Sequence, residues 1–276
     1  MTAAFRRRPI SCHDECRSLL RVSCTRDHVR HGGLKMNDRP ELRLHEEVLL
    51  LALKDDKGTP YAAQYSFALG GAVLSELLLE ERFILDEKPR KKPLKPGKKP
   101  NYVVAIDDSK PLADPILDEC LHRVSTSKKA RSPQDWVTRF SQLKDLKRRI
   151  AVGLCRRGIL REREDRILVL FRRTAYPTLD GAPERRIVER IREAVVGDSM
   201  ELDARTAVLV ALANGTGLLK PVLGKDLVKQ RKARLEEIAE GDIVGEATKA
   251  AVQAAQAAVI AATTAATSAA VVVGGS

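Results

Sequence analysis

The stretch that decides the fold is residues 44–55, which reads Leu44-His45-Glu46-Glu47-Val48-Leu49-Leu50-Leu51-Ala52-Leu53-Lys54-Asp55. Its run of leucines predicts a short, strongly apolar helix, and the polar residues 54–58, ending in a glycine, predict a turn after it. Residues 62–79 are apolar nearly all round, which is typical of a helix buried on every side. We therefore expect these two helices to form the centre of the core.

Two strand-like runs follow, at residues 82–86 and 102–106. The segment 88–100 between them contains prolines at intervals, so it can be neither a helix nor a central strand. The pattern predicts a β-hairpin with a long basic tip. That tip carries seven Lys and Arg residues in thirteen, and it is either a solvated linker or a tether to acidic lipid or nucleic acid.

Two helix starts are clearly marked downstream. Asp114-Pro115 places an acidic N-cap before a first-turn proline, and Ser132-Pro133-Gln134-Asp135 resembles a capping box. The second helix is expected to run to Arg157, with Gly158 as its left-handed cap. Its apolar positions recur three and four residues apart and predict a buried face made of Leu143, Leu146, Ile150 and Leu154. The same spacing places Lys144, Lys147 and Arg148 together on another face.

A second hairpin is predicted around five consecutive apolar residues that arginines bracket: Ile167, Leu168, Val169, Leu170 and Phe171. We expect this run to be a strand that pairs with residues 159–163, with a turn near 164–165. Because the run does not alternate, both of its faces need cover. Three interpretations follow: a strand buried on two sides, a contact between copies of the chain, or a wedge that enters the lipid interface.

Further helices are predicted at about residues 183–196, 202–213 and 226–240, and in the Ala-rich stretch from residue 246. The expected fold class is therefore mainly α, a single helical domain with two small β-hairpins. We expect the domain to span residues 39–266, between a disordered N-terminal extension, 1–38, and a C-terminal tail, 267–276. The uncharged run 250–273 is rich in Ala, Thr, Ser and Gln, which favours a buried or surface-lying helix over a membrane span.

The composition limits the class of partner. The formal net charge is +12, which favours a polyanion, either nucleic acid or anionic lipid. Aromatic residues make up only 4% of the chain, too few for a protein that stacks single-stranded bases. Five cysteines without framework spacing indicate reduced thiols and a cytosolic compartment, and the N-terminus lacks the apolar core of a secretory signal.

No catalytic centre is predicted. The His45-Glu46-Glu47-Val48-Leu49 segment begins like a zinc-protease motif, but a leucine stands where the second histidine must be, so a polar helix start is expected. Cys12, Cys16, Cys24, His28 and His31 lack the paired spacing of a zinc site. The Gly215-Thr216-Gly217 segment follows a helix and predicts a helix-ending turn. We therefore expect no enzyme activity, no metal and no cofactor.

An ordered series of motifs resembles the Golgi phosphoprotein 3 family over about residues 40 to 265. It begins with the 44–55 helix, its turn and Gly58, and it continues through the following segments: Ala68-Leu69-Gly70-Gly71-Ala72-Val73-Leu74-Ser75-Glu76-Leu77, Leu117-Asp118-Glu119, Asp135-Trp136, Arg149-Ile150-Ala151, Arg157-Gly158-Ile159-Leu160, and the strand exit from Phe171 to Pro177. The short turn and plain Ala-rich helices are more similar to bacterial members.

The resemblance implies a mostly helical peripheral membrane protein that binds phosphatidylinositol 4-phosphate. Eukaryotic members sit on the cytoplasmic face of the Golgi and hold client membrane proteins by their tails. Members also associate through the hydrophobic hairpin, which here is the segment from Ile167 to Phe171, so a homo-oligomer is expected. Nucleic acid is not a partner in this reading.

The resemblance also implies a headgroup site. Its aromatic residue falls on Tyr61, and its two arginines one turn apart fall on Lys144 and Lys147, beside Arg148 on the face already identified by periodicity. A further family arginine falls on Gly70, which has no side chain. Lysine keeps the charge of arginine but loses the planar fork that matches a phosphate, so anion binding is expected with weakened selectivity for the 4-phosphate.

Two functions of different classes remain open at this point. The first is a membrane adaptor that binds an anionic lipid headgroup. The second is a nucleic-acid-binding regulator in which the two hairpins act as wings beside a basic helix, although Asn and Gln that could read bases are scarce there. Vesicle flotation set beside a DNA gel shift separates the two.

Overall fold

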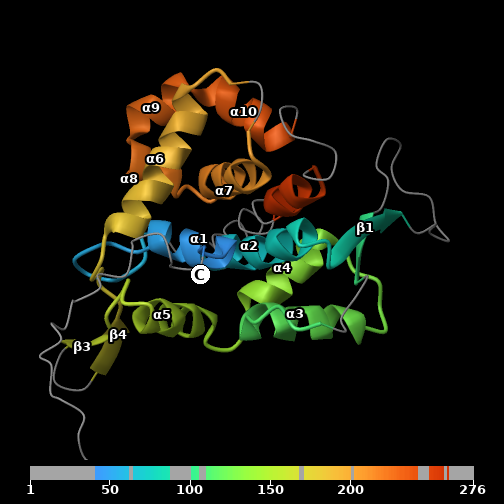
Figure 1. Ribbon diagram of the computed structural model, residues 1–276, viewed down its shortest axis with the longest axis horizontal. Coiled ribbons are helices and arrows are strands. Elements are labelled where there is room, and N and C mark those ends of the chain that lie inside the picture. The colour runs from blue at the N-terminus through green and yellow to red at the C-terminus, as the bar shows by residue number, and fades with distance from the viewer. Residues whose placement is uncertain are drawn as a thin grey trace, which may run out of the picture. The chain divides into compact units, whose positions relative to one another are not determined.

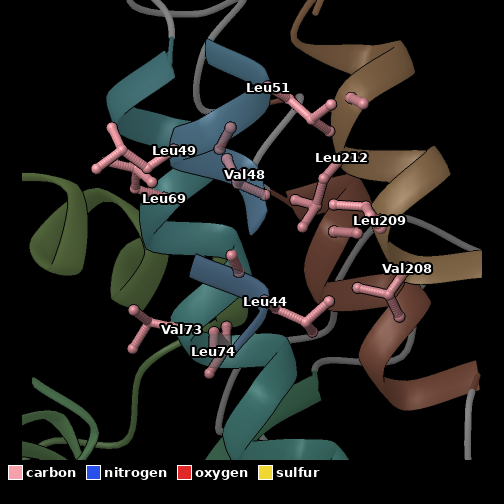
Figure 2. Close-up of a cluster of buried hydrophobic side chains, with 14 of the residues drawn as sticks. Leu44, Val48, Leu49, Leu51, Leu69, Val73, Leu74, Val208, Leu209 and Leu212 are labelled. Carbon is pink, nitrogen blue, oxygen red and sulfur yellow. The ribbon is translucent and has the colours of Figure 1, made fainter. Parts of the chain in front are cut away.

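Two apolar helices, α1 (Leu44–Ala52) and α2 (Tyr65–Leu79), lie at the centre of the fold, as the sequence predicts (Figure 1). The computed structural model describes residues 41–61, 65–87, 101–105, 110–167, 171–199, 202–241, 249–257 and 260. Every residue of α1 is buried. Figure 2 shows the side chains of α1 and α2, among them Leu44, Val48 and Leu74, gathered with Val208 and Leu209 in one hydrophobic cluster.

The other helices pack on opposite sides of this central pair. On one side α2 contacts α3 and α4 while α1 contacts α5, and on the other side both central helices contact α7, with α6 against α1 and α7. The bounds are α3 Pro115–Ser125, α4 Pro133–Ser141, α5 Leu146–Arg156, α6 Ala182–Val196, α7 Ala204–Gly215, α8 Leu219–Leu223, α9 Lys225–Gln230 and α10 Lys232–Glu240. Residues 249–257 are also helical, and Ser75 on α2 donates a hydrogen bond to the carbonyl of Ala251.

The two β-hairpins are confirmed, one of them in a different register from that expected. Strands β1 (Phe83–Glu87) and β2 (Asn101–Ala105) pair antiparallel as predicted. Strands β3 (Arg163–Ile167) and β4 (Phe171–Ala175) also pair antiparallel, with Ile167 opposite Phe171. The predicted pairing of 159–163 with 167–171 is therefore wrong, because the chain reverses within the apolar run and not at residues 164–165. Residues 168–170 themselves lie outside the described residues.

The helix expected from Ser132 to Arg157 is two helices. Ser132 caps α4 as predicted, and Asp135 completes the capping box, but α4 ends at Ser141. Asp145 then adopts a left-handed conformation with φ 55° and becomes the N-cap of α5. The break falls where Leu143 and Leu146 are both buried, so packing of the two leucines outweighs the continuous helical period. Gly158 follows the end of α5 with φ 70°, as expected.

A second predicted helix is also divided. Residues 226–240 form α9 and α10, which meet at Arg231. By contrast, Gly215-Thr216-Gly217 ends α7 as predicted, with Gly217 in a left-handed conformation. The predicted fold class, mainly α with two small hairpins, is confirmed. The extension 1–38, the basic tip 88–100 and the tail 267–276 lie outside the described residues. No helix in the described ranges is both long enough and apolar enough to cross a membrane.

Candidate functional site

A cavity of about 360 Å³ opens where α2, the start of α5 and β4 meet. Its lining combines hydroxyl groups with positive charge over an apolar floor. The lining residues are Tyr65, Ser66, Leu69, Ser141, Leu143, Asp145, Leu146, Lys147, Arg148, Thr174 and Tyr176. We call it the α5 cavity. Two of the four residues proposed for the headgroup site, Lys147 and Arg148, line it.

Lys147 is one of the two cations that line this cavity. It is half-buried, and its Nζ lies 5.5 Å from the centroid of the Tyr176 ring, a cation–π contact. Burial lowers the pKa of Lys147, and the nearby Arg173 lowers it further. Within the described part of the chain neither Lys147 nor Arg148 takes part in an ion pair. A bound anion would relieve the repulsion that Lys147 experiences.

The local backbone explains how these groups are held. The buried side chains of Leu146 and Ile150 fix α5 on the core, which leaves Lys147 and Arg148 at the rim. On the opposite wall, the backbone N–H of Tyr176 donates to the carbonyl of Gly58. A Cβ at Gly58 would lie 2.2 Å from the Tyr176 carbonyl carbon, so only glycine permits this approach of the turn to the strand exit.

Lys144 faces a different cavity. The break before α5 places it in the lining of a larger cavity of about 850 Å³ between α1, α3 and α5, which also includes Asp145 and Arg148. Most charged groups there are paired: Glu119 accepts from Arg123 at 2.8 Å and from Arg149 at 2.6 Å. Lys144 and Lys147 thus lie on neighbouring cavities that share Arg148 and Asp145 as a common border.

Tyr61 is exposed at the surface, with 45% of its area accessible. Its ring lies 5.6 Å from the Lys54 Nζ, and its pKa is raised by partial burial and then by Asp55 and Glu184. It is not among the residues that line the α5 cavity. Contact between Tyr61 and a headgroup therefore stays a prediction.

Gly70 explains in structural terms why a family arginine is missing. A Cβ at this position would lie 2.5 Å from the Val137 carbonyl oxygen and 2.8 Å from the Ser141 backbone nitrogen. Helix α2 therefore packs directly on the backbone of α4 at Gly70, and no side chain fits. The third cation that the resemblance leads one to expect has no room here.

Sequence reasoning did not identify several residues of the site. The hydroxyl groups come from α2 (Tyr65), α4 (Ser141), β4 (Thr174) and the residue after β4 (Tyr176), and the charge of Arg173 on β4 lowers the pKa of Lys147. The arginine pair after the apolar run is visible in the sequence, but its position near α5 depends on the hairpin register. No local pattern encodes that register.

The acidic residues that open α1 serve the core. Helix α1 starts at Leu44 with His45, Glu46 and Glu47 in its first turn, as predicted, but all three side chains are buried. Glu46 accepts from Arg157 at 2.8 Å and Glu47 accepts from Arg190 at 2.7 Å. His45 Nε2 lies 3.2 Å from Asp114.

On α2, the fully buried Glu76 carboxylate is the centre of a larger network. It accepts from Arg205 at 2.9 and 3.0 Å, from Arg43 at 3.2 Å and from the Leu44 backbone N–H at 2.7 Å. These contacts join α2 to the start of α1 and to α7. Over the described residues, no cluster of His, Cys, Asp and Glu could hold a metal ion.

Two comparisons with known proteins find similar sequences. Residues 44–255 match the family described as Golgi phosphoprotein 3 (GPP34). The chain is also 29% identical, over 186 residues, to the vacuolar protein sorting-associated protein 74 of Schizosaccharomyces pombe. That similarity covers 62% of this chain and 53% of the yeast protein, so the chain spans about half the length of this curated relative. The region that matches the family, residues 44–255, contains α1, α2, both hairpins and the whole α5 cavity. The chain therefore belongs to the Golgi phosphoprotein 3 (GPP34) family.

Proposed function

We propose that this chain is a peripheral membrane protein that binds the phosphate of an anionic phospholipid headgroup in the α5 cavity. The observation that carries the proposal is the pair Lys147 and Arg148, which lines this cavity without an ion-pair partner among the described residues. The family match supports the same assignment.

The chemistry of the lining suits a phosphate group. A phosphate oxygen can accept from Lys147 and Arg148 in charge-assisted hydrogen bonds and from the hydroxyl groups of Tyr65 and Thr174. The phosphate charge would also raise the lowered pKa of Lys147 toward its usual range. Asp145, the carboxylate in the lining, restricts where the phosphate can sit, because it repels an anion on its side of the cavity.

The selectivity of this site among anionic lipids depends on the number and kind of cations that contact the headgroup phosphate. We expect a phosphoinositide similar to phosphatidylinositol 4-phosphate to be bound, but with weaker preference over other anionic lipids than the family arginines would give. A lysine offers a point charge where arginine offers a planar fork, and Gly70 offers no donor at all. Lys144, at the neighbouring cavity, and Tyr61, at the exposed turn, are proposed to contact the surrounding anionic surface.

The hairpin formed by β3 and β4 supports the second part of the proposal. We infer that Ile167, Leu168, Val169, Leu170 and Phe171 bring copies of the chain together or enter the lipid interface. Two or more copies on one membrane would strengthen binding by avidity. An adaptor of this kind needs no catalytic group, and it could hold client membrane proteins by their tails on a cytoplasmic membrane face, that of the Golgi in a eukaryotic cell.

The proposal is tested by flotation with vesicles that contain phosphatidylcholine and phosphatidylinositol 4-phosphate. Lys147→Glu with Arg148→Glu should reduce binding at least about a hundredfold, because two charge-assisted phosphate contacts of about 1.5–3 kcal/mol each become repulsive. The matched control is Lys128→Glu with Lys129→Glu, the same charge change at exposed residues that line none of the cavities described above. Its binding should fall only slightly, through the lower net charge.

The same proteins should be placed in a gel shift with double-stranded DNA. Equal loss of flotation in both variants would show that only net charge matters and would reject the α5 cavity. Tight DNA binding that Lys147→Glu with Arg148→Glu removes, without vesicle binding by the parent, would favour the nucleic-acid regulator instead.

For the hairpin, a Leu168→Asp variant that is folded but sediments as a smaller species would support association through this segment.

A further inference from the structure

A third cavity, on the helices after α7, has a larger excess of positive charge than the α5 cavity or the 850 Å³ cavity beside it. A cleft of about 350 Å³ is formed by α8, α9, α10 and the end of α7. Its lining residues are Asn214, Lys220, Val228, Leu235 and Glu236 together with Lys225, Lys229 and Lys232. We call it the lysine cleft. Four lysines face one carboxylate there.

The charge of this cleft is only slightly compensated. Lys232 Nζ lies 3.4 Å from Glu236, and both side chains are mostly exposed. Within the ranges that the structure describes, Lys220, Lys225 and Lys229 take part in no ion pair. Lys225 and Lys229 stand four residues apart on α9, which places like charges on one helix face and destabilises the helix. An anion in the cleft would remove this repulsion.

Helix α9 packs on the rest of the fold through partly buried side chains only. It contributes no fully buried residue, in contrast with α10, which it contacts. Its partly buried Leu227 and Val228 rest on the core cluster, and its lysines point to the cleft lining. One side of the short helix therefore packs on the core, and its lysines line the cleft.

Hydrogen bonds of one arginine hold the junction of α9 and α10, which lies between Lys229 and Lys232. At the junction of α9 and α10, the Arg231 guanidinium donates to the carbonyls of Val195, Val196 and Gly197 and to Asp198. These carbonyls end α6, where a helix carries unsatisfied acceptors. The junction is thus tied to the end of α6 by four hydrogen bonds. The cleft is shaped before any ligand arrives.

We propose that the lysine cleft is a second anion site, which binds a small group that carries two or more phosphates. Lysine ammonium groups act as point charges toward phosphate and need no fixed plane, and the cleft volume suits a headgroup-sized ligand. Asn214 adds an amide donor. Val228 and Leu235 offer apolar contact to the carbon atoms of such a ligand. The source can be a soluble phosphate ester or a membrane lipid headgroup. The site does not depend on the α5 cavity.

The test uses the full-length chain and titration calorimetry with inorganic pyrophosphate and with inositol 1,4-bisphosphate. Lys225→Glu with Lys229→Glu should weaken binding of at least one of these probes about a hundredfold, since two charge-assisted contacts become repulsive. Lys128→Glu with Lys129→Glu is the control with the same charge change. The Lys147→Glu, Arg148→Glu variant should bind the soluble probe like the parent at this cleft, which separates this site from the α5 cavity.

A parallel arm uses vesicles that contain phosphatidylinositol 4,5-bisphosphate or only phosphatidylserine. Loss of soluble-probe binding in the cleft variant supports a soluble ligand, and loss confined to the bisphosphate vesicles supports a lipid headgroup. If the cleft variant binds both probes and both vesicles as the control does, the proposal is wrong. The same proteins should be placed in a gel shift with double-stranded DNA, and loss of DNA binding alone in the cleft variant would equally reject the proposal.

Discussion

The buried carboxylates of the central helices and the cations of the α5 cavity are opposite uses of charge in one small domain. Glu46, Glu47 and Glu76 each accept from arginine at 2.7–2.9 Å and lie within the core. Lys147 and Arg148 lie at a cavity rim and have no ion-pair partner among the described residues. The buried glutamates join helices to one another. The two cavity cations are left available for an anion from outside.

The two kinds of charge differ in how burial affects the stability of the charged form. A buried charge is tolerated only when a counter-charge and hydrogen bonds replace the lost water, and Glu76 has both. Glu47 shows the balance at work: burial raises its pKa although Arg190 opposes the shift. Lys147 experiences burial without a counterion, so its pKa is lowered. The unpaired group is the one that gains from a ligand.

The largest effect is expected for Glu76→Gln. The variant keeps the shape of the side chain but removes the buried negative charge with which Arg205 and Arg43 pair, which should lower the free energy of unfolding by about 3–5 kcal/mol. Urea unfolding measures this loss. Glu80→Gln is the control, because Glu80 pairs with the same Arg43 but its side chain is 37% exposed, and it should cost at most about 1 kcal/mol. Equal losses in the two variants would contradict the contrast between buried and exposed pairs.

The next largest effect is expected at Gly70. Gly70→Ala should lower the free energy of unfolding by about 1–3 kcal/mol, because the new methyl group meets the backbone of α4. Gly70→Arg should cost more and should not improve lipid binding. Gly153→Ala in α5 is the matched control, since its Cβ would meet only Glu46 Oε1 at 4.0 Å, and alanine favours a helix by about 0.5–1 kcal/mol. A stable Gly70→Arg protein with tighter vesicle binding would show that the third cation can be restored.

An effect confined to a window of pH is expected at Glu184, a half-buried acid without an ion-pair partner among the described residues. Burial and the hydrogen-bonded Asp55 raise the pKa of Glu184 from 4.5 to about 7. The folded state therefore holds this proton more tightly than the unfolded state. The free energy of unfolding should fall as pH rises from about 4.5 to about 7, and then change no further on account of this group.

Glu184→Gln should remove that part of the pH dependence, so that the variant gains on the parent as pH rises through this window. Urea unfolding at a series of pH values measures the gain. Glu189→Gln, an exposed position on the same helix, is the control and should follow the parent. Parallel curves for Glu184→Gln and the parent would mean that Asp55 and Glu184 share no proton.

Local signals predicted much of the fold. The cap residues Asp114 and Ser132 begin their helices as expected because each offers a side-chain oxygen to backbone N–H groups of the first turn. The first hairpin and the central position of α2 also follow from pattern alone. The break at Asp145 does not, since residues 142–145 contain neither Gly nor Pro, and the packing of Leu143 and Leu146 decides it.

The site was predicted less completely for the same reason. Periodicity and the family likeness agree on Lys144 and Lys147, and periodicity alone added Arg148. The periodicity assumed a continuous helix, and the break before α5 places Lys144 at the neighbouring cavity. Thr174 and Tyr176 reach the site through the register of β3 and β4, a tertiary property that no short motif in this chain records.

The long-range arginine contacts of α1 and α2 also set an order of events on the ribosome. The partners of Glu46, Glu47 and Glu76 follow them by 111, 143 and 129 residues in the chain. The helices that are synthesised first therefore cannot bury their carboxylates until α5, α6 and α7 have left the exit tunnel. The nascent core has to wait for its last arginine, Arg205, so the domain should fold late in translation and in one cooperative step.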